Sequence, residues 1–296
     1  MPVTLPPSVR REPGVGDADV LILDAPSGTA RLHLYGAHLV SWVPTGQDDV
    51  LWVSAASRYA PGAAIRGGVP LCFPWFGPHA SGTGPAHGFA RVSVWHLLEA
   101  ADLPDDAHPG GAVAVTLGLT EQDVDAALTT VWPHPFEARV RVVVGRELSV
   151  SLAVRNTGAQ PFSVSEALHT YLAVDDVRST SVEGLDGATY VDKVDGGEEH
   201  VQRGPVTFTG ETDRVYTGTG STTRLVEPRR TVTVAKSGSR STVVWNPWSE
   251  KAAQMADVPD DGWTGFVCVE TANALDDTLT VDPGEVRTLT TRLSLH

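Results

Sequence analysis

Cysteine, lysine and long apolar runs are all scarce in this chain. The 296 residues include only two cysteines, Cys72 and Cys268, which are too few for a disulfide framework and lack metal-ligand spacing. The stretch Met1–Arg11 contains no apolar run of signal-peptide length, and no segment stays uncharged long enough to span a bilayer. We therefore expect a cytoplasmic protein with two reduced thiols and no membrane partner.

Positive charge is also in short supply. The chain has 22 lysine and arginine residues against 36 aspartate and glutamate residues, a formal net charge of −14, and no basic block. Nucleic-acid binding requires a concentrated basic surface, so this class of partner is excluded. An acidic protein that binds an anion must gather its few cations locally, which draws attention to arginines beside glycine-rich loops.

Sustained helical periodicity is missing too, and alternation of apolar and polar residues takes its place. Turn sequences such as Asn156-Thr157-Gly158 and Asp282-Pro283-Gly284 separate the alternating segments. The pattern predicts a large antiparallel β-sandwich, which we expect to form one domain over residues 1–296. The clearest predicted strands are Ala30–Leu34, Glu137–Val144, Glu147–Val154, Thr231–Ala235 and Glu285–Leu295.

Two stretches interrupt this alternation. Residues 59–88 are rich in glycine, proline and aromatic residues, as expected of a long ordered binding loop. Residues 196–230 are polar and have few large apolar side chains, so we expect short strands and exposed loops there. The first stretch is the more promising place to look for a site.

Within that loop, Arg66 is followed by two glycines, and Arg91 follows soon after the loop ends. The glycines permit unusual backbone angles, and each arginine can bind a phosphate through two hydrogen bonds. Trp75 and Phe76 offer an apolar wall for a sugar ring. The alternative is that the glycines form turns, the aromatic residues fill the core and the arginines pair with carboxylates. The density of the cluster favours a binding site.

Two further segments supply acid/base groups. His169 lies in the strand-like run Glu166–Val174, and Glu270 ends the apolar run that starts at Phe266. A histidine beside a carboxylate can serve as a general acid near neutral pH, and a buried carboxylate has its pKa tuned by its surroundings. Each residue alone is also compatible with a structural histidine and with a carboxylate that simply reaches solvent.

The order of these segments resembles the glucose-6-phosphate 1-epimerase family, also called hexose-6-phosphate mutarotases, along nearly the whole chain. The matching segments are Ile65–Pro70, Phe73–Gly77, His87–Arg91, Leu168–Tyr171, Tyr190–Lys193, Val244–Trp248 and Val269–Glu270.

The resemblance implies an all-β fold, the galactose mutarotase-like antiparallel β-sandwich or supersandwich, and a site on its concave face that needs no metal and no cofactor. It assigns catalysis to His169 and Glu270. It assigns substrate binding to four positions: Arg66, His87, Arg91 and Asp192. Relatives often have a polar residue, commonly glutamine, directly before the His-Gly pair, whereas this chain has Ala86. We expect a monomer whose partner is a small-molecule sugar phosphate.

Exchange of anomers requires opening of the hemiacetal, with a base at the C1 hydroxyl and an acid at the ring oxygen. We expect Glu270 as the base and His169 as the acid, facing each other across a gap wide enough for a pyranose ring. Three alternatives are an epimerase for free aldoses, a noncatalytic carbohydrate-binding sandwich, and a metal-binding barrel using His87, His169 and Glu270. The two arginines argue against the first, and the paired acid/base residues argue against the second. The lack of a short ligand pattern argues against the third.

The thiols are expected to stay outside the chemistry. In a strand, Cys268 shares its face with Glu270, and Cys72 follows the glycine pair of the binding loop. Their apolar neighbours predict buried, slowly reacting thiols with raised pKa values.

Overall fold

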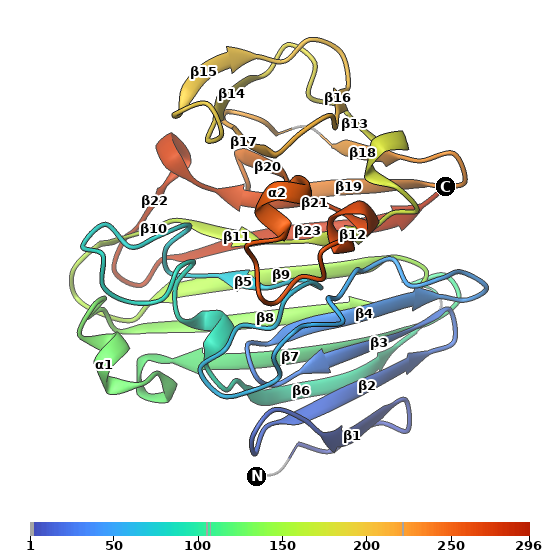
Figure 1. The fold of residues 1–296 in the computed structure, drawn as a ribbon. Coiled ribbons are helices and arrows are strands. Elements are labelled where there is room, and N and C mark those ends of the chain that lie inside the picture. The colour runs from blue at the N-terminus through green and yellow to red at the C-terminus, as the bar shows by residue number, and fades with distance from the viewer. Residues whose placement is uncertain (1–2, 105, 107, 221) are drawn as a thin grey trace.

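The fold is built almost entirely from antiparallel strands (Figure 1). The computed structural model describes residues 3–104, 106, 108–220 and 222–296. Within these ranges the strands form sheets of nine, eight, four and two strands, and every paired strand is antiparallel to its neighbour. The prediction of an all-β antiparallel sandwich is confirmed.

The nine-stranded sheet forms one layer of the sandwich. Alternation dictates its central strands, because in Phe136–Val144 every second residue is buried while those between are partly exposed. In sheet order its strands are β16 (Val206–Thr207), β13 (Ser181–Glu183), β18 (Thr223–Val226), β19 (Thr231–Ser237), β23 (Val286–Leu295), β9 (Leu148–Asn156), β8 (Phe136–Val144), β7 (Ala112–Thr120) and β6 (His96–Leu103).

The eight-stranded sheet lies over part of that layer, with its strands β11 and β21 in contact with β23. In sheet order its strands are β15 (Glu198–Val201), β14 (Thr189–Asp192), β17 (Thr212–Tyr216), β20 (Ser241–Asn246), β21 (Phe266–Asn273), β11 (Glu166–Leu168) and β5 (Leu71–Cys72), while β12 (Tyr171–Ala173) also pairs with β21.

The N-terminal sheet covers another part of the same layer, where its strands β2 and β3 contact β7 and β8 (Figure 1). It consists of β1 (Val9–Pro13), β2 (Asp19–Ala25), β3 (Gly28–His33) and β4 (His38–Pro44). The fourth sheet pairs β10 (Phe162–Val164) with β22 (Leu279–Val281).

Helices are short throughout the described residues. They are α1 (Ala126–Thr129), α2 (Trp248–Ala252) and the 3₁₀ turns η1 (Ala90–Val92), η2 (Glu121–Asp123), η3 (Val177–Ser179), η4 (Gly262–Gly265) and η5 (Leu275–Asp277). None of them is both long and apolar enough to cross a bilayer.

Two apolar clusters lie on opposite faces of the eight-stranded sheet. The larger one fills the space between the layers and contains residues such as Leu168, Val244 and Val269. The smaller one, which we call the outer cluster, contains residues that alternate with these along the same strands: Cys72, Ala167, Tyr171, Val215, Val243, Trp245, Phe266, Cys268, Ala272 and Ala274. Trp52, Phe76 and Met255 pack against the outer cluster from segments outside the strands. All eight residues of β21 are consequently buried, which explains its nearly continuous apolar sequence.

The five clearest predicted strands are confirmed, as β3, β8, β9, β19 and β23, with ends that shift by at most two residues. The loop predicted over residues 59–88 contains the two-residue strand β5 and otherwise runs without strands. The polar stretch 196–230 holds the short strands β15, β16, β17 and β18, as expected.

Candidate active site

His169 and Glu270 lie directly opposite each other across two neighbouring strands. Strand β11 pairs Leu168 with Thr271, and strand β12 pairs Tyr171 with Cys268. Both pairings share one register, and that register places His169, in the break between β11 and β12, opposite Glu270. Directly opposed residues of an antiparallel pair have Cβ atoms about 4.5–5.5 Å apart, close enough for side-chain contact.

The two side chains are in contact and nearly sealed from solvent. The His169 Nε2 atom lies 3.2 Å from Glu270 Oε1, and the side chains are 9% and 1% exposed. The expected gap for a pyranose ring between them is therefore wrong. Glu270 also sits in the middle of strand β21 rather than at its end.

Each member of the pair keeps one polar atom without a partner among the described residues. Nδ1 of His169 and Oε2 of Glu270 are buried and make no hydrogen bond there. Leaving a buried polar group unpaired costs about 1–3 kcal/mol, so native structures rarely tolerate it without a functional reason. Two such atoms in one contacting pair indicate a site prepared for a ligand.

Burial pushes both residues of the pair towards their neutral forms. It is the largest cause that lowers the pKa of His169 well below 6.5, with smaller contributions from His87, Arg66 and Arg91. Burial likewise raises the pKa of Glu270 well above 4.5, and Lys193 opposes this shift. A neutral pair and an ion pair differ only in which residue holds the single proton, and burial favours the neutral pair, with that proton on Glu270.

Aromatic rings fix the orientation of His169. The Tyr171 ring stacks on the imidazole at a centroid distance of 4.8 Å and an interplanar angle of 14°, and Trp245 meets it edge-on at 5.9 Å. Tyr171 and Trp245 both belong to the outer cluster, which places the pair on the face of the sheet that points away from the nine-stranded layer. The imidazole is therefore held by packing on two sides.

Arg66 reaches this assembly from the glycine-rich loop. Its Nη1 donates to the Tyr171 hydroxyl at 3.0 Å, while Nε and Nη2 each lie 3.0 Å from Oδ2 of Asp257. The glycine that follows is required: Gly67 has φ of 104°, and a Cβ there would lie 2.4 Å from the Trp52 carbonyl oxygen. Arg66 thus reaches the site with its charge balanced by Asp257.

Arg91 differs because it has no carboxylate partner among the described residues. Its Nη2 donates to the Ala86 carbonyl oxygen at 2.6 Å. Its Nε is buried and forms no hydrogen bond with any described residue. Burial is the main cause that lowers the pKa of Arg91, and the charge of Arg66 adds to this. A partly exposed guanidinium with an unpaired Nε–H is suited to receive an anion.

His87 lies beside the pair of His169 and Glu270. Its ring meets the ring of His169 edge-on at a centroid distance of 5.7 Å and that of Phe76 at 5.0 Å. The two aromatic residues predicted to form a wall for the sugar lie on different faces of the sheet. Phe76 packs against the outer cluster, whereas Trp75 is buried in the core between the layers.

Asp192 is the predicted site residue that the fold does not bring to the others. Its Oδ2 accepts from Arg214 Nε at 3.2 Å and its Oδ1 from the Val194 backbone N–H at 3.0 Å. The neighbour Val191 pairs with Val215 of the outer cluster, so Asp192 points to the opposite face of the sheet from Glu270.

Two residues that the sequence did not single out as site residues, Asp213 and Lys193, lie on the face of Glu270 instead. Asp213 pairs in register with Trp245 of the outer cluster, and the Lys193 Nζ lies 3.7 Å from its Oδ1. The same Nζ sits 4.6 Å from the ring centroid of Phe76. Asp213 also contributes to the raised pKa of Glu270. No local signal marks Asp213, because its place depends on the pairing of β17 with β20.

Both cysteines are free and buried, and burial raises the pKa of each thiol, as expected. Cys268 lies on the outer face with Glu270, and Cys72 contacts His87 at 3.3 Å between Sγ and Nδ1.

A surface cavity of about 590 Å³ lies elsewhere, and none of the predicted site residues lines it. Its lining comes from the β8–β9 turn, the loop before β7 and the end of β23: His108, Pro109, Gly111, Ala112, Val143, Gly145, Arg146, Glu147, Ser149, Arg292, Ser294, Leu295 and His296. The unpaired polar atoms at His169 and Glu270 are a stronger sign of a functional site than cavity size.

Comparison with known proteins connects this geometry to a family. The sequence profile described as aldose 1-epimerase matches residues 19–294. An Escherichia coli (strain K12) protein named "Putative glucose-6-phosphate 1-epimerase" is 38% identical over 261 residues, covering 87% of this chain and 84% of that protein. A Cenchrus ciliaris protein of the same name is 35% identical over 274 residues, covering 90% and 81%.

Solved structures agree with these matches. The crystal structure of a Salmonella typhimurium protein described as a "putative mutarotase" superimposes with a TM-score of 0.88 at 35% identity, covering 99% of this chain and 95% of that one. A galactose mutarotase-like protein from Clostridium acetobutylicum has a TM-score of 0.73 at 14% identity, covering 97% and 98%, a likeness of fold alone. The predicted galactose mutarotase-like fold is confirmed.

Proposed function

This chain belongs to the aldose 1-epimerase family, and from that premise we propose that it interconverts the α and β anomers of a hexose 6-phosphate, with glucose 6-phosphate as the favoured substrate. The observation that carries the proposal is the contact between His169 and Glu270, each with one buried polar atom left unpaired among the described residues. The names of the relatives supply the substrate class.

Direct contact between the two residues suits the chemistry better than a wide gap. The C1 hydroxyl and the ring oxygen are bonded to the same carbon, so the groups that act on them must also lie close together. Substrate binding replaces the mutual contact of His169 and Glu270 with one contact to each of these oxygens. The acid/base pair then needs no rearrangement beyond a small separation.

Ring opening moves two protons in a balanced way. The proton that the neutral pair holds on Glu270 first moves to His169. Glu270 then takes the proton of the C1 hydroxyl, His169 gives its proton to the ring oxygen, and the C1–O5 bond breaks to leave an aldehyde and a C5 hydroxyl. Rotation about C1–C2 presents the other face of the aldehyde. Reclosure returns both protons with the two roles reversed. Because the pair begins and ends with one proton, each turnover restores the enzyme.

We assign the 6-phosphate first to Arg91. Its Nε–H is buried, and among the described residues this N–H has no partner and no carboxylate neutralises the guanidinium. Arg66 already shares its charge with Asp257 and contributes a weaker attraction. Lys193 adds a further positive charge close to the pair, partly offset by Asp213.

The proposal is tested by measuring α-to-β exchange with NMR exchange spectroscopy for glucose 6-phosphate, glucose and galactose. We expect catalysed exchange of the phosphorylated sugar and much slower catalysis for both free sugars. Faster exchange of free galactose than of glucose 6-phosphate would favour an epimerase of free aldoses. Saturable binding of sugar without any exchange would indicate a noncatalytic binding protein.

The phosphate assignment has its own variant. Loss of a charged hydrogen bond costs about 1.5–3 kcal/mol, so Arg91→Ala should raise KM for the phosphorylated sugar about 10- to 150-fold. Arg224→Ala, which removes an arginine from an exposed pair with Glu183, is the matched control. Equal losses for phosphorylated and free sugars in Arg91→Ala would refute the assignment.

A further inference from the structure

His87 is held more rigidly than a loop histidine usually is. Its backbone N–H donates to the Gly77 carbonyl oxygen at 2.6 Å, and its own carbonyl oxygen accepts from the Phe73 N–H at 3.3 Å. Its φ is 61°, and the following Gly88 packs so closely that a Cβ would lie 2.0 Å from the Phe73 carbonyl oxygen. The backbone therefore fixes the position of the His87 Cα and Cβ atoms, from which the imidazole ring extends.

The Nδ1 atom of this ring faces two hydrogen-bond donors. The backbone N–H of Gly77 points at Nδ1 with a nitrogen-to-nitrogen distance of 3.3 Å. A backbone amide can only donate, so this contact favours Nδ1 as the unprotonated, accepting nitrogen. The thiol of Cys72 lies 3.3 Å from the same atom, and because burial raises its pKa it keeps its hydrogen and can donate as well.

We propose that Gly77 and Cys72 lock His87 in its neutral tautomer with the hydrogen on Nε2, so that His87 presents a fixed N–H donor to an acceptor oxygen of the sugar. Cys72 is in this respect a positioning residue, which acts through His87. The inference rests on the proposed function, since it assigns a role to that same site.

The position of Nε2 supports this role. In an imidazole ring the two nitrogens point away from each other, so Nε2 is directed away from Cys72 and Gly77. No residue within the described ranges forms a hydrogen bond with it. The centroid of the ring lies 5.7 Å from that of His169, so His87 borders the pair proposed to act on the sugar.

The neutral state of the ring is consistent with its surroundings. Burial lowers the pKa of His87 to about 3, with further contributions from the positive charges of Arg91, Lys193 and Arg66. A neutral Nε2–H can donate to an oxygen lone pair but cannot accept a hydrogen bond. A fixed donor of this kind favours a hydroxyl, ether or phosphate oxygen and disfavours an ammonium group at the same place.

The first test reads the tautomer directly and needs no substrate. In ¹⁵N-histidine-labelled protein, long-range ¹H–¹⁵N correlation spectra should show His87 with a protonated Nε2 and an unprotonated Nδ1 throughout pH 6–8. A protonated Nδ1, or a mixture of tautomers in the wild-type protein, would overturn the inference. Because this reading is made on the free protein, it stands or falls separately from the proposed epimerase activity.

The second test compares two amides at position 87. Glutamine carries its amide nitrogen close to the position of Nε2, whereas asparagine ends near Nδ1. We expect His87→Gln to keep KM for glucose 6-phosphate near the wild-type value and His87→Asn to raise it by about 2- to 12-fold, the effect of one hydrogen bond. Asparagine tolerates positive φ better than glutamine does, so backbone strain alone predicts the reverse order, and that order would overturn the inference.

The third test addresses Cys72. Cys72→Ala removes the thiol donor and should introduce a detectable population of the other tautomer, with KM raised about 2- to 5-fold and kcat changed less. Cys72→Ser restores an O–H donor and should restore the tautomer. Cys268→Ala, a buried cysteine of the same outer cluster that does not contact His87, controls for loss of volume and should leave the His87 resonances unchanged. An alanine variant with the wild-type tautomer and KM would remove Cys72 from the proposal.

Discussion

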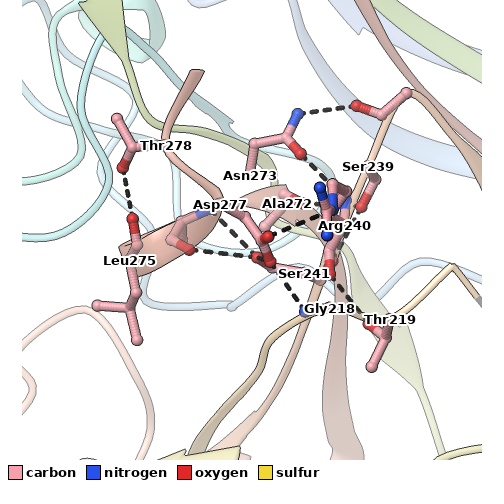
Figure 2. A network of polar contacts seen from close by, with 12 residues as sticks. Gly218, Thr219, Ser239, Arg240, Ser241, Ala272, Asn273, Leu275, Asp277 and Thr278 are labelled. Carbon is pink, nitrogen blue, oxygen red and sulfur yellow. Dashed lines mark hydrogen bonds and ion pairs between the residues drawn. The ribbon is translucent and has the colours of Figure 1, made fainter. Parts of the chain in front are cut away.

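Strand β21 carries two buried polar clusters that differ in how completely they are hydrogen bonded. In the middle of the strand, Glu270 contacts His169 and keeps one oxygen that pairs with none of the described residues. At the end of the strand, Asn273 opens a network that ties together the β19–β20 turn, the β17 end and the segment before β22 (Figure 2).

In the network at the strand end, the side chains of Asp277, Ser241 and Asn273 have hydrogen-bond partners, and only the adjoining Glu166 keeps one oxygen unpaired among the described residues. Asp277 accepts from the Ser241 hydroxyl at 2.7 Å and from the Gly218 N–H at 3.0 Å. Its Oδ1 lies 3.5 Å from Nε of Arg240 (Figure 2). Asn273 donates to the Gly238 carbonyl oxygen at 2.8 Å and accepts from the Arg240 N–H at 3.1 Å. These contacts join segments that the sheet alone does not connect.

The difference separates a structural cluster from the one that we propose to be catalytic. A buried polar group stabilises a fold only when its partners are all present. The pair at the middle of β21 lacks two of its partners within the described residues, and the sugar is proposed to supply them. We therefore expect changes at the middle of the strand to affect catalysis and changes at its end to affect stability.

The largest effect is expected at the catalytic pair. Because each positioned acid or base contributes about 10²–10⁴-fold, Glu270→Gln and His169→Asn should each lower kcat for anomer exchange by that factor. Neither should lower the free energy of unfolding much, since removing an ionisable group from the interior also removes its desolvation cost. NMR exchange rates measure kcat, and urea unfolding measures the free energy of unfolding. A kcat within tenfold of wild type would contradict a catalytic role for the middle of β21.

The next effect concerns Glu166, the buried carboxylic acid that borders the strand-end network. Asn273 donates to its Oε1 at 3.1 Å, while Oε2 has no partner among the described residues, and burial raises the pKa of Glu166 to about 7. The folded state therefore holds this proton more tightly than the unfolded state. The resulting stability is fully present below about pH 4.5 and is lost as the pH rises through about 7.

In numbers, this loss amounts to about 3 kcal/mol between pH 4 and pH 8. Glu166→Gln carries no titrating proton, so urea unfolding of the two proteins at pH 5 and pH 8 isolates the effect. The wild type should lose stability relative to Glu166→Gln as the pH rises. A difference that is constant with pH would show that the folded-state pKa of Glu166 is not raised.

A smaller loss is expected from Asp277→Ala. The substitution leaves the Gly218 N–H without its acceptor and the Ser241 hydroxyl with only the longer contact of 3.3 Å to the Ala274 carbonyl oxygen, which costs about 1–3 kcal/mol. Thermal or urea unfolding should show this loss while kcat stays close to the wild-type value. A large fall in kcat with unchanged stability would show that the strand-end network takes part in catalysis. The two clusters of β21 would then not differ in role.

The smallest effect compares two aspartates on opposite faces of the eight-stranded sheet. Asp213→Asn removes the negative charge that offsets Lys193 on the face of Glu270, so KM for the anionic glucose 6-phosphate should fall a few-fold. Asp192→Asn changes a residue bonded to Arg214 on the other face and should leave KM and kcat nearly unchanged. Steady-state kinetics of both variants give the two constants. A larger effect at Asp192 than at Asp213 would support the substrate-binding role that the sequence resemblance assigned to Asp192.

Much of the fold could be predicted from the sequence, because alternation depends only on neighbouring residues. A strand with one buried face must alternate, so Glu137–Val144 and Glu285–Leu295 were recognisable without any partner strand. The order of the Arg66, His87, Arg91, His169 and Glu270 segments likewise predicted the family, and the residue types predicted acid/base chemistry.

The tertiary structure decided what those residues do to one another. The shared register of β11 and β12 against β21 sets His169 in contact with Glu270, where the sequence suggested a gap. Pairing of β17 with β20 brings Asp213 to the site, while Asp192 falls on the opposite face. Asp257, far from Arg66 in sequence, decides that Arg91 rather than Arg66 is left without a counter-charge.

The physical reason is the same in each case. A sequence specifies which residues of one strand share a face, since side chains alternate with a period of two. It does not specify which residue of a distant strand will lie opposite, because that register is set by the packing of the whole sheet. Facing residues, counter-ions and the proton on a histidine ring all depend on such distant neighbours, so the acid/base residue types were readable from the chain and their arrangement was not.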